Sequence, residues 1–276
     1  MNFTFIAILS AVFAAVASIL ARVLLKDLKS KAILGLNFLI MAGSLLILSP
    51  FFYQFTFTVS NILLILLISS IDTLGNYYYF KTFEKTEASI ATPMLSLAPG
   101  FTFLFGWVIL GETVSLQTIV LSLLLIILII VFSMDFSDLK KFRSQTLWPA
   151  ITSSFLFGIS AIPSKMLLHS GSINAPTLYL FRAACIGFFA SIVFKSSIRG
   201  ISARQLWFMF IRGIFVIAQW ILLYLALTSG SSGVAVTLGN ITPIFVFIFS
   251  MLFLREKPTF KKAITCVLIL GISLLI

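Results

Sequence analysis

The sequence predicts an all-α integral membrane protein with ten transmembrane helices, arranged as two inverted five-helix repeats. The composition, the number of apolar runs and a likeness between the two halves of the chain lead to this fold class. Of the 276 residues, 60% are hydrophobic and 10% are charged, and the mean hydropathy is +1.16. An ordinary soluble domain has about 25% charged residues. The composition therefore excludes a water-soluble fold.

Apolar runs separated by short polar breaks recur along the whole chain. A helix needs roughly 20 mostly apolar residues to cross a bilayer core about 30 Å thick. We expect ten such helices, at residues 3–25, 32–53, 59–80, 88–109, 115–134, 147–168, 175–194, 205–228, 232–254 and 260–276. The positive charges near the first run follow it instead of preceding it, so we interpret this run as a retained helix and not as a signal peptide.

One longer polar stretch, residues 135–146, divides the ten runs into five and five. We therefore predict a first five-helix repeat at residues 1–134, a cytoplasmic linker at 135–146 and a second repeat at 147–276.

The basic residues indicate the orientation in the membrane. Fifteen of the 19 Lys and Arg residues fall in the first, third, fifth, seventh and ninth loops, and the loops between these hold none. The positive-inside rule places the basic loops in the cytoplasm and both termini outside it. In a soluble protein the net charge of +11 would suggest a nucleic-acid partner. Here we interpret the excess of basic residues as a signal of orientation in the membrane and expect no nucleic-acid partner.

The two halves resemble one another at a fixed offset. Residues 91–112 pair with 235–256 at an offset of 144, which superimposes Pro99 on Pro243 and Glu112 on Glu256. Because each repeat has an odd number of crossings, the second must lie upside down relative to the first. Inverted repeats are typical of transporters that bind substrate near the midplane.

The residue inventory restricts the chemistry that the chain can carry. One His and two Cys cannot supply a His/Cys metal cluster, a haem pair or a disulfide framework. The sequence has no Walker, HExxH, GxSxG or dinucleotide fingerprint. We expect no enzyme, no metal and no cofactor, and an ATP-driven pump would need a partner chain.

Asp72 lies near the middle of the third predicted helix, with Asn76 one turn further on the same face. A charged carboxylate at that depth costs roughly 2.5–3.5 kcal/mol. One interpretation is a site for a substrate amine or a proton, facing a central cavity. The alternative is an Asp that is protonated or held by a neighbouring basic residue for packing alone.

Arg182 lies well inside the seventh predicted helix and cannot lose its charge. It must pair with an acid, with carbonyl groups or with an anionic group of a substrate. A structural ion pair with Asp72 and a substrate carboxylate are equally compatible with the sequence.

Pro99 and Pro243 lie near the centres of the fourth and ninth predicted helices, where each removes a backbone hydrogen bond. Interruptions at equivalent places in two halves indicate a hinge or an unwound binding site, although a static kink is the alternative. Asn240 adds a polar group at the same depth. Gln219 and Trp220, in the middle of the eighth predicted helix, complete the candidate substrate-binding residues, because an amide there needs a partner or a wet cavity.

Arg22, Lys165 and Arg212 also lie inside apolar runs or at their ends. At an offset of 143 between the two halves, Arg22 aligns with Lys165. For both of these, and for Arg212, we expect side chains that snorkel to the lipid headgroups. For Glu112 and Glu256 we expect a role at helix ends.

In these features the sequence resembles members of the drug/metabolite transporter superfamily, specifically the EamA-type members with ten helices. The likeness covers nearly the whole chain and rests on Pro99 and Pro243 in the fourth helix of each repeat, and on the Glu that follows in LGET and LREK. Arg182 in LYLFRAA matches a common basic residue of the repeat's second helix, but the first half has Phe38 near the equivalent place. No symmetric pair of arginines can therefore be assumed.

The resemblance implies a secondary-active transporter, most simply an exporter, that moves small metabolites such as amino acids or amphiphilic compounds across the inner membrane without ATP. The expected mechanism is alternating access between the repeats, coupled to a proton or counter-substrate gradient. The expected partners are a small-molecule substrate and membrane lipid, with the chain as a monomer or a homodimer. The alternative is a flippase that moves a lipid headgroup along the cavity.

Overall fold

The computed structural model describes residues 3–85, 95–133, 144–195 and 200–254, together with residues 264, 268, 271, 272 and 275. The helices in these ranges are α1 (Phe3–Leu25), α2 (Ser30–Leu48), α3 (Val59–Lys85), α5 (Ala98–Leu110), α6 (Leu116–Ser133), α7 (Ser144–His169), α8 (Ala175–Phe194), α9 (Ala203–Ser229), α10 (Ser232–Gly239) and α11 (Thr242–Leu254), with short 3-10 helices at Ser49–Phe51 and Leu95–Leu97.

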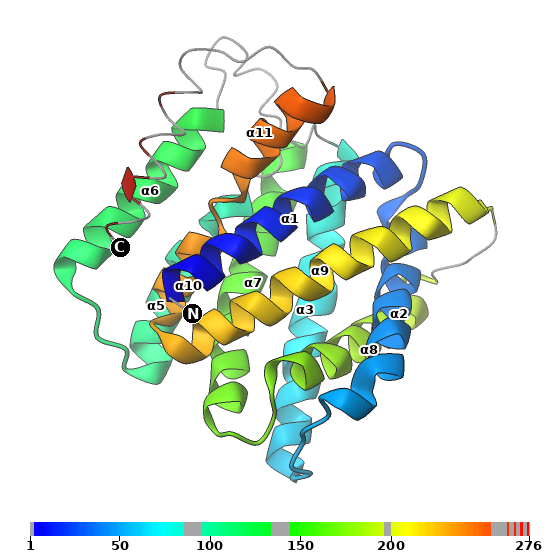
Figure 1. Cartoon of the computed structure of the whole chain (residues 1–276), viewed down its shortest axis with the longest axis horizontal. Helices are drawn as coiled ribbons and strands as arrows, with labels where there is room; N and C mark the ends of the chain where they lie inside the picture. Colours follow the sequence, from blue (N-terminus) through cyan, green and yellow to red (C-terminus); the bar gives the residue numbers. More distant parts are fainter. Residues whose placement is uncertain are drawn as a thin grey trace.

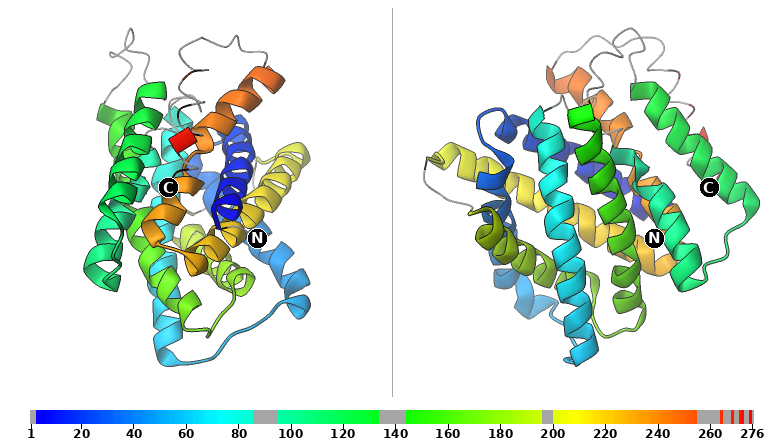
Figure 2. Two further views of the ribbon diagram at one scale, coloured as in Figure 1. Left: turned by 60° about the vertical axis from the view of Figure 1, so that its left-hand side comes forward. Right: turned by 180° about the vertical axis from the view of Figure 1, so that it is seen from behind.

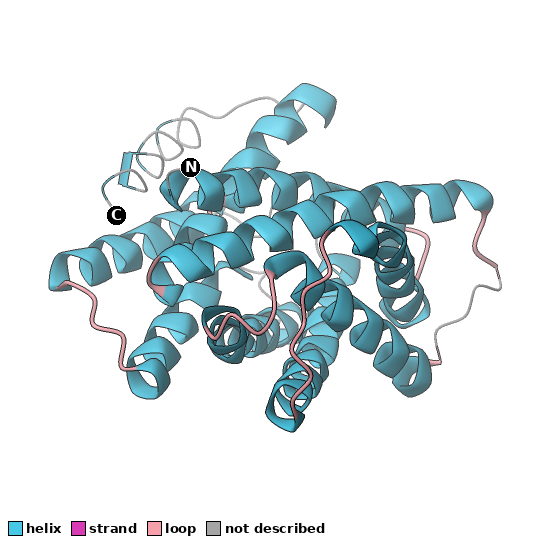
Figure 3. Ribbon diagram, turned by 60° about the horizontal axis from the view of Figure 1, so that its bottom comes forward, coloured by secondary structure: helices cyan, strands magenta, loops and turns pink. Residues whose placement is uncertain are grey.

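The described part of the chain is helical throughout, without an extended sheet, and most helices are joined by short loops (Figure 3). Seven helical segments within it are long and apolar enough to cross a membrane. The protein is therefore a multi-pass membrane protein. The count of ten crossings stays a prediction, because residues 88–94 of the fourth predicted helix and most of the tenth lie outside the described residues.

Several boundaries differ from those expected. The second helix ends at Leu48 instead of continuing to residue 53, since Pro50 follows in a 3-10 turn. The third continues to Lys85, and α7 begins at Ser144, inside the stretch predicted as linker. The prediction of one continuous ninth helix at residues 232–254 was wrong, because the structure divides this segment into α10 and α11.

The two halves have matching helix boundaries. Adding 144 to the first and last residues of α3 gives those of α9, and the same shift converts α5 into α11. The offset that aligns the sequences therefore also aligns the secondary structure.

The helices also exchange packing partners in a symmetric way. Helix α1 packs most extensively on α9, and α7, its counterpart in the second half, packs most extensively on α3. Helices α2 and α8, which correspond to one another, pack together. Figure 1 shows α1 and α9 side by side in front, and Figure 2 shows α3 and α7 side by side from behind. This pattern is the one that a twofold relation between the halves produces.

Small residues allow the helices to approach closely where they cross. Gly158 of α7 lies so near α5 that an added Cβ would stand 2.6 Å from Phe101 Cβ and 3.0 Å from the Ala98 carbonyl oxygen. Gly187 of α8 has a similar position against Leu39 of α2. Small residues at such contacts are typical of membrane helix packing, because lipid provides no hydrophobic drive for association.

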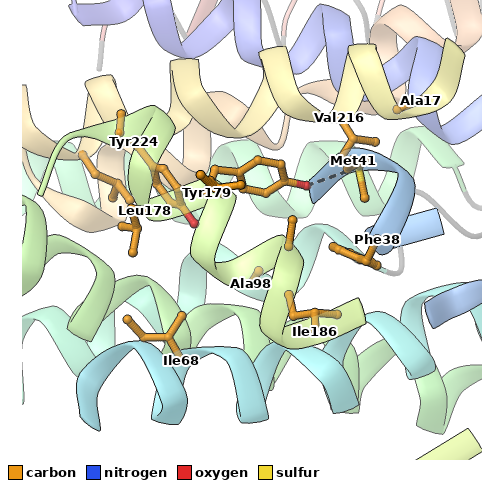
Figure 4. Close-up of a cluster of buried hydrophobic side chains, with 14 of the residues drawn as sticks. Ala17, Phe38, Met41, Ile68, Ala98, Leu178, Tyr179, Ile186, Val216 and Tyr224 are labelled. Atoms are coloured by element: carbon orange, nitrogen blue, oxygen red, sulfur yellow. Dashed lines mark hydrogen bonds between the residues drawn. The ribbon is translucent and has the colours of Figure 1, made fainter. Parts of the chain in front are cut away.

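A buried cluster of apolar and aromatic side chains occupies the centre of the bundle (Figure 4). Tyr179 of α8 lies in the middle of it, between Tyr224 of α9 and Met41 of α2. Its hydroxyl donates a hydrogen bond to the Met41 sulfur at 3.6 Å. A buried phenol needs such a partner, so this contact fixes the distance between α8 and α2.

Replacing Gly158 with Ala should lower the melting temperature of the purified protein, because the methyl group would meet the α5 backbone. Overpacking of this kind costs about 1–3 kcal/mol. Gly43→Ala in α2 is the matched control, since nothing lies within 4 Å of an added Cβ there. A helix favours Ala over Gly by roughly 0.8–1.0 kcal/mol, so the control should not be destabilised. Equal melting temperatures for the two variants would contradict the close packing of α5 on α7.

Candidate functional site

An α-helix begins just before Pro99, directly after the 3-10 turn Leu95–Leu97, and another begins just before Pro243, after a break that follows α10. Each proline is the second residue of a new helix, α5 or α11, and not the centre of a continuous one as the sequence suggested. Proline is favoured in the first turn of a helix, where its missing N–H removes no hydrogen bond. The prolines therefore begin helices here instead of kinking them.

The end of α10 is capped by the residues of the interruption. The backbone N–H of Asn240 donates to the carbonyl of Val236 at 3.0 Å, and its side-chain amide donates to the same carbonyl at 2.8 Å. The hydroxyl of Thr242 donates to the Gly239 carbonyl at 3.0 Å. Since a helix end inside a membrane cannot bond to bulk water, these contacts satisfy carbonyl groups that the break exposes.

A cavity of about 120 Å³ lies beside the starts of α5 and α11. A single water molecule needs roughly 10–15 Å³ on this measure, so the space is large enough for a small metabolite. Its described walls come from α1, α3, α7 and α9, from Leu95 and Ala98 on one side, and from the region of α10 and α11 on the other.

The cavity walls follow the internal repeat. Six pairs of its lining positions are related by the sequence offsets of 143 or 144, namely Ala14 and Phe157, Ser18 and Ala161, Asn76 and Trp220, Tyr79 and Leu223, Leu95 and Gly239, and Ala98 and Thr242. The cavity therefore lies where equivalent parts of the two halves meet.

Asp72 and Arg182 are joined to each other in an ion pair. Asp72 Oδ2 accepts a hydrogen bond from Arg182 Nη2, and the two side chains are 0% and 2% exposed. Neither residue is among those that line the cavity. Of the alternatives left open by the sequence, the structure therefore adopts the buried ion pair, and the expectation that Asp72 faces the cavity is wrong for this conformation.

Two aromatic rings separate this ion pair from the cavity. The guanidinium carbon of Arg182 lies 4.7 Å from the centre of the Trp220 ring and 5.1 Å from that of Tyr224, and both rings line the cavity. These contacts are within the range of cation–π attraction. Trp220 thus lies between the charge and the cavity.

Three further predicted site residues line the cavity. Asn76 donates its side-chain amide to the Asp72 carbonyl at 2.8 Å, one turn back along α3. The backbone carbonyl of Gln219 accepts a hydrogen bond from Ser10 of α1 at 2.9 Å, which joins α9 to α1. Asn240 lies at the break described above. The fold therefore brings Asn76, Gln219, Trp220 and Asn240 together around one cavity.

Arg212 was wrongly expected to reach the lipid headgroups. Its side chain is 4% exposed and lines the cavity from α9. Nη1 donates to Asn37 Oδ1 of α2, and the guanidinium carbon lies 4.8 Å from the centre of the Phe80 ring. A residue two turns into an apolar helix can face either lipid or a cavity, and the sequence contains no signal that separates the two.

Arg22 and Lys165 both donate hydrogen bonds to main-chain carbonyls at helix ends. Arg22 donates to the carbonyls of Phe83 and Glu84, at 2.7 and 3.4 Å, near the end of α3. Lys165 donates to the carbonyl of Gly230, at 2.6 Å, just after the end of α9. Each repeat-related cation therefore stabilises the negative end of a helix in its own half of the chain.

Glu112 connects Lys165 to the start of α10. One carboxylate oxygen lies 2.7 Å from Lys165 Nζ, and the other accepts hydrogen bonds from the Ser232 N–H at 3.0 Å and the Ser231 hydroxyl at 3.2 Å. Burial alone raises the pKa of Glu112, but the hydrogen bonds from Lys165 and Ser232 outweigh it and hold the pKa below its ordinary value. The carboxylate thus caps α10 as an anion.

The helices and the cavity define a multi-pass membrane protein with two related halves that both contribute to the walls of one cavity. The model of the EamA-like transporter family matches residues 2–134 and 146–276. The chain therefore belongs to the EamA-like transporter family, as a two-repeat member, and the resemblance inferred from the sequence is confirmed.

Two individual proteins are similar to the chain. An "Uncharacterized transporter" of Archaeoglobus fulgidus is 24% identical over 216 residues, which cover 77% of this chain and 76% of that protein. A solved structure described as "Crystal structure of protein" has a TM-score of 0.72 at 14% identity, and the match covers 98% of this chain and 93% of that one. The second likeness supports the fold alone.

Substituting Glu112 with Gln should lower the melting temperature at pH 7 by the equivalent of about 1–3 kcal/mol, because Lys165 loses its charged partner. Since the pKa of Glu112 is lower in the folded protein than in the unfolded chain, its contribution is present above the ordinary value of about 4.3 and is lost as the pH falls below it. Thermal unfolding of both proteins from pH 7 to pH 3.5 measures this. Parallel pH profiles would contradict the assignment.

Removing only one charge of the central ion pair should destabilise the fold. Asp72→Asn leaves Arg182 without an acidic partner, and breaking a buried pair costs roughly 3–5 kcal/mol. The double variant Asp72→Asn/Arg182→Met removes both charges and should recover most of the lost melting temperature. An unchanged melting temperature in the single variant would show that the pair does not stabilise the fold.

Proposed function

We propose that the protein is a secondary-active transporter that exports small metabolites by alternating access between its two halves. The observation that carries the proposal is the cavity, which lies between repeat-related positions of both halves, beside the start of α5 and the break between α10 and α11. Transporters with inverted repeats bind substrate at such interruptions near the bilayer midplane.

The inverted relation of the repeats is part of the proposal. The matching boundaries of α3 and α9, and the exchange of partners between α1 and α7, support a twofold relation. The alternation of basic and uncharged loops supports opposite orientations of the two halves in the membrane. The same distribution supports an inner-membrane protein whose two termini lie outside the cytoplasm.

The chemistry of the walls supports small amphiphilic substrates. Amide and hydroxyl groups from Asn76, Gln219 and Ser164 alternate with the apolar surfaces of Trp220 and Leu223. A binding site of this kind is typically apolar with a few polar groups that fix orientation. In the proposed mechanism, rocking of one half against the other exposes the cavity to either side of the membrane, driven by a proton or a counter-substrate.

Comparing the metabolites inside and outside expressing cells tests this function. Cells carry the wild type, Ala161→Phe, Leu74→Phe or an empty vector, and untargeted mass spectrometry measures both compartments. Ala161→Phe fills the cavity, whereas Leu74 is 47% exposed on an outward face of α3, so Leu74→Phe adds the same side chain away from the cavity. We expect one or more compounds in the medium only with the wild type and Leu74→Phe.

Other results would contradict parts of the proposal. A compound that is depleted from the medium would reverse the direction. A change confined to lipids would indicate the flippase, and identical profiles from all four strains would overturn transport of small metabolites.

A further inference from the structure

Arg212 is a buried positive charge on the cavity wall that has no acidic partner among the residues that the structure describes. Its hydrogen-bond partners are neutral groups, the amide of Asn37 and the side chain of Tyr79, and its Nε atom has no hydrogen-bond partner. The Phe80 ring covers one face of the guanidinium group. A buried arginine keeps its charge, so an uncompensated one in a membrane interior is costly.

Among the described residues, no nearby acidic group neutralises the charge of Arg212. Asp72 neutralises Arg182, and both are held behind the rings of Trp220 and Tyr224. Neither Asp nor Glu occurs among the described residues that line the cavity. The cavity and its immediate surroundings therefore have a net positive charge in the described part of the protein.

The helix ends at the cavity add to this potential. Ala98 and Thr242, the first residues of α5 and α11, both line the cavity, and the beginning of a helix has a partial positive charge. The opposing carbonyl groups at the end of α10 are already bonded to Asn240 and Thr242. The electrostatic preference is therefore for an anion.

We propose that the cavity binds a small organic anion, whose carboxylate pairs with Arg212 and whose apolar body lies against Trp220 and Phe157. This inference rests on the proposed function and specifies the substrate class of the same cavity. Arg212 is the anchor and Arg182 is not, because Arg212 lines the cavity without an acidic partner among the described residues, whereas Arg182 is paired with Asp72 and lies behind aromatic rings. Guanidinium and carboxylate groups match in shape and charge, which gives a strong and oriented contact.

Ligand binding to the purified full-length protein in detergent tests this directly. The probes are phenylacetate, its neutral amide phenylacetamide and the cation 2-phenylethylamine, which have similar apolar bodies and different charges. Trp220 lines the cavity, whereas Trp107, Trp148 and Trp207 are 67%, 70% and 60% exposed on the outside of the protein. A ligand in the cavity should therefore change the tryptophan emission mainly through Trp220. We expect the wild type to bind phenylacetate at least tenfold more tightly than the amide or the amine.

Two variants separate the charge of Arg212 from its role in packing. Arg212→Gln should reduce the affinity for phenylacetate at least tenfold and leave the affinity for phenylacetamide unchanged. Asn37→Asp keeps the shape of its side chain and should stabilise the fold by pairing with Arg212, yet it should also weaken phenylacetate binding because it supplies an internal anion. Arg204→Gln is the matched control, since Arg204 is an exposed arginine near the start of the same helix.

The inference is overturned if the wild type does not prefer the carboxylate, or if Arg212→Gln and Asn37→Asp both bind phenylacetate as the wild type does. Failure of the proposed function has a different signature. Selective carboxylate binding in detergent, combined with identical metabolite profiles in cells, would support the anion site and overturn transport. Export of amines or neutral compounds only would support transport and overturn the anion site.

Discussion

The structure depends on one constraint, which is that a polar group inside a lipid bilayer must find its partner within the protein. The break between α10 and α11 meets this constraint locally, since Asn240 and Thr242 bond to the last carbonyls of α10. Farther along the bundle, Arg22 and Lys165 bond to carbonyls at the ends of α3 and α9. Cations and helix ends therefore occur together within each half, and the ion pair of Glu112 with Lys165 joins one half to the other.

The scaffold is nearly symmetric, but the charges inside it are not. The offset of 144 relates Asp72 to Val216, Arg182 to Phe38 and Arg212 to Ile68, so each of the three central charges has an apolar counterpart in the other half. Matching helix boundaries need only a shared pattern of apolar residues and breaks. A binding site for an asymmetric molecule needs different groups on its two sides, which the unmatched charges provide. The symmetric part of the fold forms the cavity, and the asymmetric part gives it a chemical preference.

Hydropathy was enough to predict most of the helices, because the thickness of the bilayer imposes a length on every crossing. The sequence also indicated which positions are unusual, since Asp72 and Arg182 are expensive in a membrane wherever they point. It could not decide between an ion pair and a substrate contact, because that choice depends on the rotation of α3 relative to α8. The same limitation affects Arg212. Whether it faces lipid or a cavity depends on the neighbours of α9, and these come from α1 and α2 as well as from its own half.

By itself the sequence determined that the chain crosses a membrane, that its two halves are related and that the chain resembles EamA-type transporters. Composition, periodicity and internal repetition are properties of the chain alone, so they can be recognised without a structure. Only the tertiary structure decided that Pro99 and Pro243 begin helices, that Asp72 neutralises Arg182, and that Arg212 remains as the cation on the cavity wall in the described part. Each of these outcomes depends on distances between segments more than 100 residues apart or on where a helix is capped, which local sequence does not encode.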